Sequence, residues 1–207
     1  MVKLAAIFFT MILVDNYVLA KFLGICPFLG VSKKLDSAVG MSLAVTFVMV
    51  LATAATWPIQ TFLLTPANAD GTLKWDMGYL QTIVFILIIA ILVQLLENFL
   101  KKFIPALYKS LGVYLPLITT NCTILGVTIL NLDNGYNFIE SIVCAAGAGI
   151  GFLVAMVLFS GVRRRVEQAV TPKCFEGLPI TLVAAAVTSL SFMGFGGIID
   201  AIFNVAA

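Results

Sequence analysis

The sequence contains no histidine. This absence excludes His-ligated haem, Rieske-type iron–sulfur centres and zinc sites built on imidazole, and it removes the commonest general base of enzymes. Any metal site would therefore depend on cysteine sulfur or carboxylate oxygen. No phosphate-binding loop or flavin-attachment signature is present either, so we do not expect the chain itself to bind NAD.

Charged residues are equally scarce, at 11% of the 207 residues, whereas 61% are hydrophobic. No soluble domain of this length could bury so much apolar surface, so the solvent for most of the chain must be membrane lipid. We expect one integral-membrane domain over residues 1–207, in contact with lipid and without a nucleic-acid partner.

Four cysteines are present, and none lies in a short Cys-x-x-Cys spacing. The chain also lacks the small secreted context in which disulfide frameworks occur, so we expect free thiols. Cys144 lies among small residues that are typical of a close helix-packing surface, and we interpret it as a packing residue. We interpret Cys174, in a loop, as incidental.

Six apolar runs predict an all-α, polytopic fold with six transmembrane segments, because about 20 residues suffice to cross the hydrocarbon core. The first run follows Lys3 without a clear cleavage site, so we expect a membrane segment rather than a signal peptide. Two runs are too long for one straight crossing, and breaking each near its cysteine would resolve this. The runs cover residues 4–31, 38–64, 79–100, 103–132, 138–161 and 178–205.

The loops predict the orientation. If sides alternate, the side opposite the N-terminus receives nine basic residues, and the N-terminal side receives Lys3 and Lys74. The positive-inside rule then makes the basic side cytoplasmic and places both termini outside a bacterial inner membrane. The nine basic residues are Lys33, Lys34, Lys101, Lys102, Lys109, Arg163, Arg164, Arg165 and Lys173.

A motif repeats in the two long runs. Cys26 and Cys122, 96 residues apart, each begin the pattern Cys-x-x-Leu-Gly-Val. We expect Gly24 and Pro27 to interrupt the first run and Pro116 to interrupt the fourth. Hydrophobic segments that are interrupted at matching places in two halves point to a functional site. Three segments in each half (about 1–102 and 103–207) predict a 3+3 inverted repeat with Cys26 and Cys122 facing each other at mid-depth.

The chemistry that this arrangement offers is thiolate ligation. Helix ends, hydroxyls and free amides near the two cysteines would stabilise thiolates and the sulfides of an iron–sulfur cluster. Clusters ordinarily take four cysteines, so a partner would have to supply two more. The residues alone leave three alternatives open, which are a symmetric pair of packing cysteines, a small inverted-repeat secondary transporter, and a structural membrane anchor of a redox complex.

The two motifs, Leu23–Val31 and Thr119–Gly126, resemble those of the Rnf/Nqr integral-membrane family, and the similarity extends over nearly the whole chain. The resemblance implies a membrane component of an ion-translocating ferredoxin:NAD oxidoreductase. It implies that Cys26 and Cys122 are metal ligands to one [2Fe–2S] cluster shared with a homologous six-span subunit of opposite orientation. Flavin- and ferredoxin-type subunits, and coupled Na⁺ or H⁺ transport, are implied as well, without stand-alone catalysis.

Ionisable residues inside membrane segments are functional candidates. Asp15 could bind a cation or pair with Lys21, although six residues is a poor spacing for a pair on one straight helix. For Glu97 we expect an ordinary i,i+4 ion pair with Lys101.

Overall fold

The structure is a computed structural model that describes residues 2–32, 35–64, 80–103, 115–169 and 172–194. Within those residues the regular elements are all helices, which confirms the predicted all-α class. The helices are α1 (Val2–Leu13), α2 (Ile25–Val31), α3 (Leu35–Ile59), the π-helical η1 (Gln60–Leu64), α4 (Gln81–Phe103), α6 (Leu115–Thr119), α7 (Cys122–Asp133), α8 (Phe138–Glu167), the 3-10 helix η3 (Lys173–Phe175) and α9 (Leu178–Met193).

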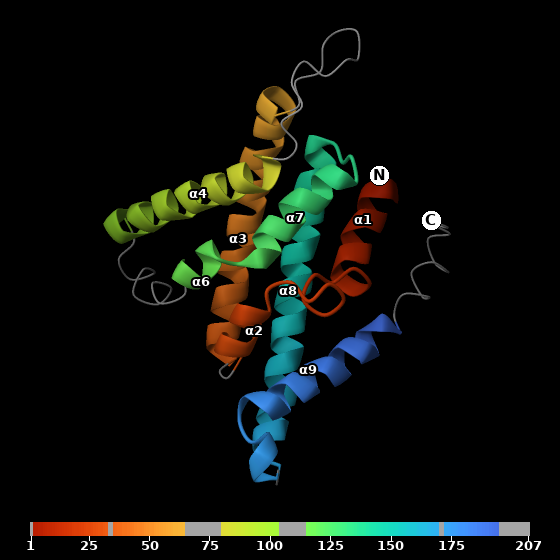
Figure 1. Cartoon of the computed structure of the whole chain (residues 1–207). Coiled ribbons are helices and arrows are strands. Elements are labelled where there is room, and N and C mark those ends of the chain that lie inside the picture. The colour runs from red at the N-terminus through yellow and green to blue at the C-terminus, as the bar shows by residue number, and fades with distance from the viewer. Residues whose placement is uncertain (1, 33–34, 65–79, 104–114, 170–171, 195–207) are drawn as a thin grey trace.

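The long helices α3 and α8 lie side by side at the centre (Figure 1) and make the most extensive contact between elements. They run antiparallel, because Trp57 near the end of α3 donates its indole N–H to the Tyr136 carbonyl just before α8, at 3.1 Å. Midway along the pair, a Cβ placed on Gly149 would overlap the side chain of Thr46. The backbones approach this closely only because position 149 has no side chain.

Helix α1 packs on the other side of α8, where Gly147 and Gly151 approach its backbone. A Cβ on Gly151 would lie 2.9 Å from the Met11 carbonyl oxygen, and Cys144 in the same stretch is fully buried. The prediction of a small-residue packing surface is therefore confirmed. Lys3 and Glu140 pair at 2.8 Å, so α1 and α8 begin at the same end of the molecule.

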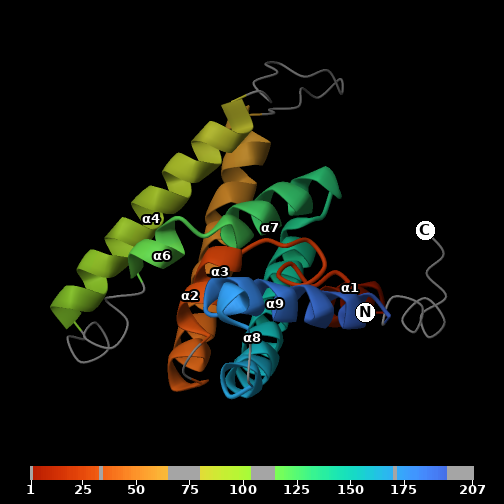
Figure 2. The ribbon, with the colours of Figure 1, turned by 60° about the horizontal axis from the view of Figure 1, so that its bottom comes forward.

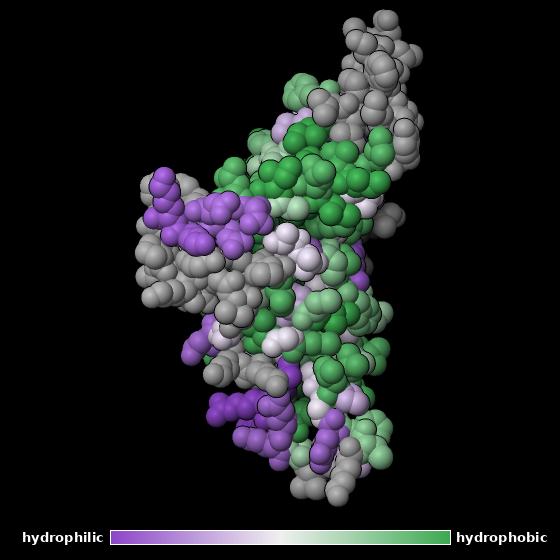
Figure 3. All heavy atoms as spheres, turned by 60° about the vertical axis from the view of Figure 1, so that its left-hand side comes forward, coloured by the Kyte–Doolittle hydropathy of each residue, from purple (hydrophilic) through white to green (hydrophobic). Residues whose placement is uncertain are grey.

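The outer helices leave large apolar surfaces open. Helix α4 leans away from the centre and α9 crosses near one end in both ribbon views (Figures 1 and 2). Figure 3 shows hydrophobic residues over much of the visible face, with hydrophilic residues gathered in separate groups. Of the described helices, three are long and apolar enough to cross a membrane, and three shorter ones are apolar. The three longer spans are Leu35–Phe62, Gln81–Asn98 and Phe138–Glu167, and the shorter ones are Lys3–Leu13, Leu117–Asp133 and Leu178–Met193.

The helix boundaries differ from the prediction in one respect. Pro27 lies in the first turn of α2, so it does not interrupt that helix. A proline is tolerated there because first-turn amides have no partner within the helix. Pro116 lies in α6 directly after residues that the structure does not describe, so its effect on the fourth run stays a prediction. The beginning of the predicted 103–132 segment and the end of the 178–205 segment lie outside the described residues.

Candidate functional site

The chain between α1 and α2, residues 14–24, is not helical, and the side chain of Asn16 organises it. The Asn16 amide oxygen accepts the N–H groups of Val18 and Leu19, at 3.0 and 3.4 Å. Its amide nitrogen donates to the carbonyl oxygens of Gly151 (2.8 Å) and Ile12 (3.3 Å). Asn16 is fully buried, so these bonds replace partners that water would otherwise supply to unwound backbone.

Gly24 ends this non-helical stretch. Its φ of +80° lies in the left-handed region, which favours glycine. A Cβ there would overlap the Thr123 hydroxyl oxygen and lie 3.1 Å from the Phe152 ring. The Gly24 N–H donates to the Sγ of Cys122 at 2.9 Å, which joins two motifs that are 98 positions apart in the sequence.

The second non-helical point separates α6 from α7 at residues 120–121. Asn121 is the N-cap of α7, and its amide oxygen accepts the Thr123 N–H at 3.1 Å. Cys122 is therefore the first residue of a 12-residue helix, at the end that carries the partial positive charge of the helix. Leu23 contacts α7 at Gly126, where an added Cβ would lie 2.5 Å from the Leu23 Cδ1 atom.

These contacts bring the two candidate ligands into one neighbourhood. Cys26 follows Gly24 by two residues, so its Cα lies within about 7 Å of the Gly24 Cα along the chain. Cys26 and Cys122 are both exposed free thiols, in contrast to the buried Cys144. The described part of the chain contains no group of three or more Cys, Asp or Glu residues that could hold a metal ion. The described site thus offers two exposed thiols.

The polar atoms around the thiols fit an anionic sulfur cluster. Asn121 and Thr123 are buried, and the Asn121 amide nitrogen and the Thr123 hydroxyl have no hydrogen-bond partner in the part of the chain that the structure describes. Together with the Gly24 N–H, they add hydrogen-bond donors to a site with two soft sulfur ligands. Such donors stabilise thiolate and sulfide and tune a cluster's potential.

The other candidate residues are placed as follows. Asp15 and Lys21 form an ion pair at 3.8 Å, which the non-helical backbone between them permits. Lys21 also lies 5.1 Å above the Tyr17 ring. The predicted pair between Glu97 and Lys101 stays a prediction. Cys174, exposed in η3, is far along the chain from both motifs.

Two organising features were missed from sequence alone. Composition and spacing assign no role to Asn16, although an amide side chain in an apolar run indicates that nearby backbone groups need hydrogen-bond partners. Arg163 was counted only as one of several basic loop residues, but it is buried and bonded to α2. The indication in the sequence that Arg163 is buried is its helical spacing from Phe152 and Phe159, which places the three residues on one face of α8.

Comparison with known proteins adds the family. The model for "Rnf-Nqr subunit, membrane protein" matches residues 4–199. The chain is 55% identical over 186 residues to the A-type component of the Na⁺-translocating ferredoxin:NAD⁺ oxidoreductase complex of Acetobacterium woodii, an alignment that covers 90% of this chain and 93% of that protein. It is 50% identical over 199 residues to the A-type component of the ion-translocating oxidoreductase complex of Serratia proteamaculans, with 96% and 99% covered.

The family model spans nearly the whole chain, and it includes both cysteine motifs and the non-helical stretches that precede them. The protein therefore belongs to the Rnf-Nqr family of membrane-protein subunits.

Proposed function

We propose that this chain is the A-type membrane component of an ion-translocating oxidoreductase complex of the ferredoxin:NAD type. Two relatives that are named as A-type components of such complexes are at least 50% identical to it over nine-tenths or more of both chains. Catalysis would belong to the assembled complex, with flavin- and ferredoxin-type subunits, and the chain would not act alone. The transported ion would be Na⁺ or H⁺.

Within that complex, Cys26 and Cys122 would be two of the four ligands of a [2Fe–2S] cluster, which supplies one-electron transfer within the membrane. The observation that carries this proposal is the bond from the Gly24 N–H to the Cys122 sulfur, because it joins the two motifs at one place. Both thiols are exposed, which suits ligands shared across an interface. A homologous six-span subunit of opposite orientation would supply the other two cysteines.

The membrane arrangement proposed here is a single domain of six segments, with inverted halves at about 1–102 and 103–207 in a bacterial inner membrane and both termini outside. In support, a non-helical stretch directly precedes each cysteine helix, at residues 14–24 and 120–121. Unwound backbone at membrane depth is tolerated where protein surrounds it, and the buried Asn16 and Asn121 provide that surrounding.

The residues of this chain would have distinct tasks at such a site. The Gly24 N–H donates to the Cys122 sulfur and so holds that sulfur beside the start of α2. The first turn of α7 presents its positive end to the same sulfur. Electrons that enter a low-dielectric region raise its negative charge, and movement of a cation would offset that charge. This gives electron transfer and ion transport a shared electrostatic origin.

The proposal is tested by replacing Cys26 or Cys122 with alanine in the whole complex, with Cys174→Ala as the matched control because Cys174 is also an exposed free thiol. Either replacement should remove the iron–sulfur electron paramagnetic resonance signal of this site, two iron atoms per complex, and ferredoxin-dependent NAD reduction. Cys174→Ala should leave all three unchanged.

Two results would contradict the proposal. If the Cys26 and Cys122 variants retain iron and electron transfer, the chain would instead be a structural anchor of a redox complex. If the purified wild-type complex carries no cluster that these cysteines affect, while the chain moves a solute, it would be an inverted-repeat transporter.

A further inference from the structure

Arg163 is the one charged side chain that is buried in the described part of the chain, with 6% of its surface exposed. Its neighbours Arg164 and Arg165, on the same last turns of α8, are exposed. A buried guanidinium is costly unless hydrogen bonds and an opposite charge compensate it, so its partners indicate its role.

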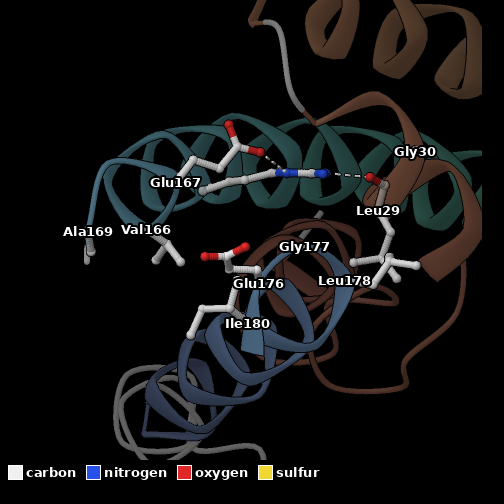
Figure 4. Close-up of a pocket in the computed structure, with 10 residues that line it drawn as sticks. Leu29, Gly30, Val166, Glu167, Ala169, Glu176, Gly177, Leu178 and Ile180 are labelled. Carbon is white, nitrogen blue, oxygen red and sulfur yellow. Dashed lines mark hydrogen bonds and ion pairs between the residues drawn. The ribbon is translucent and has the colours of Figure 1, made fainter. Parts of the chain in front are cut away.

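Those partners lie at the end of α2. One terminal nitrogen of Arg163 donates to the Leu29 carbonyl oxygen and, at 2.8 Å, to the Ser32 hydroxyl. The Nε donates to the Glu167 carboxylate at 3.1 Å, within α8 itself. Figure 4 shows Leu29 and Glu167 at opposite ends of this chain of bonds. The guanidinium therefore satisfies a carbonyl at the end of α2 that has no partner within the helix.

The same face of α8 contacts α2 one turn earlier. Phe159 stacks on Phe28, with ring centroids 4.2 Å apart, and both side chains are buried. Phe152, two turns before Phe159, lies against Gly24. Phe152, Phe159 and Arg163 follow each other at helical spacing, so a single face of α8 runs along Gly24 and α2.

The end of α2 borders open space. A cavity of about 680 Å³ is lined there by Leu29 and Gly30 of α2, by Arg163 and Glu167 of α8, and by Leu178 of α9. A Cβ on Gly30 would meet nothing within 4 Å. Helix α2 also contacts α3 and α6, but its end faces this cavity, and the Arg163 bonds to Leu29 and Ser32 fix that end.

We propose that Arg163 is a positioning residue for the Cys26 half of the site, acting as a latch between α8 and α2. Leu29 lies three residues after Cys26, about 4.5 Å further along the helix axis, so a fixed Leu29 carbonyl also fixes the height and rotation of the Cys26 thiol. The latch itself rests on the contacts above, and its effect on a cluster rests on the proposed function.

The test compares Arg163→Gln with Arg164→Gln and Arg163→Lys in the purified whole complex. Hydrogen–deuterium exchange is measured for peptides covering 25–32 and 122–133, alongside the midpoint potential and electron paramagnetic resonance line shape of the cluster. Arg163→Gln should raise exchange in 25–32 by roughly tenfold, because the bonds that close this segment are lost, and leave 122–133 unchanged. It should also shift the potential and the line shape.

Arg164→Gln should match the wild type in every readout. Arg163→Lys should give values between those of the wild type and Arg163→Gln, since lysine keeps the charge but cannot bond Glu167 and the end of α2 through separate nitrogens. If Arg163→Gln does not assemble, Ser32→Ala removes one acceptor and should change the same readouts in the same direction. Unchanged exchange and unchanged potential in an assembled Arg163→Gln complex would overturn the latch without touching the proposed function. If Arg163→Gln speeds exchange in 25–32 but the purified wild-type complex contains no iron, the latch is supported and the proposed function is overturned.

Discussion

Replacing Gly24 with alanine should disrupt the junction of the two cysteine motifs. The left-handed conformation at φ +80° costs a residue with a Cβ about 1–2 kcal/mol. The new methyl group would also overlap the Thr123 hydroxyl oxygen and lie 3.1 Å from the Phe152 ring. Such overpacking typically costs about 1–3 kcal/mol. The combined destabilisation is then roughly 2–5 kcal/mol, before any loss of the bond to the Cys122 sulfur.

The matched control is Gly30→Ala, since position 30 is helical and a Cβ there meets nothing within 4 Å. The assay is thermal unfolding of the detergent-solubilised complex, together with the maleimide labelling rate of Cys122 in the iron-free protein. For a chain of this length each kcal/mol corresponds to roughly 2–4 °C, so Gly24→Ala should lower the melting temperature by at least about 4 °C. Cys122 should label at a changed rate because its hydrogen bond is displaced, whereas Gly30→Ala should change neither quantity.

The double variant Gly24→Ala/Thr123→Ala separates the two costs. It removes the nearest clashing atom, the Thr123 hydroxyl oxygen, which has no hydrogen-bond partner among the described residues. Its melting temperature should therefore lie between those of Gly24→Ala and the wild type, and the remaining decrease measures the cost of the left-handed backbone conformation. A Gly24→Ala complex with the melting temperature and labelling rate of Gly30→Ala would refute the inferred contact between the two motifs.

Three further variants follow from the contacts of the site. Asn16→Ala should destabilise the chain by roughly 2–4 kcal/mol, seen as a lower melting temperature, because it leaves several buried backbone groups without partners, including the Gly151 carbonyl. Asn121→Ala should lower stability by about 1 kcal/mol through loss of the α7 cap, and Asn121→Ser, a neutral capping residue, should lower it less; equal melting temperatures of Asn121→Ala and the wild type would contradict the cap. Asp15→Asn should change stability by less than about 1 kcal/mol, because the pair with Lys21 is partly exposed at 3.8 Å; a selective loss of ion transport at normal stability would then assign Asp15 to the ion path.

Much of the architecture followed from composition and spacing. The apolar runs predicted the helical class, and the small residues from Ala145 to Gly151 predicted the surface on which α1 and α3 pack. These inferences succeeded because they depend on periodicity and on side-chain size, which a single sequence displays. The repeated motif predicted that positions 26 and 122 belong together; the structure bonds Gly24 to Cys122, and the pairing of the two cysteines stays a prediction.

The rest depends on contacts between distant segments. Pro27 was predicted to interrupt the first run, but a proline in a first turn looks the same in the sequence as one in a break. The breaks instead depend on Asn16 and Asn121, whose amide groups bond backbone. Arg163 resembled its exposed neighbours in the sequence, and only the tertiary arrangement shows that its partner is the end of α2.

The attachment of residues 14–32 to α8 has a consequence for the surrounding lipid. Asn16 bonds Gly151 and the end of α2 bonds Arg163, so one rod holds this segment at two points that are about 18 Å apart along its axis. Helices tilt when the hydrophobic thickness of a bilayer changes. When α8 tilts, the segment moves with it as one body, whereas Cys122 belongs to α7. The bond from the Gly24 N–H to the Cys122 sulfur would pass such a movement on to the first turn of α7, so the acyl-chain length of the host membrane should bear on the geometry of both motifs together.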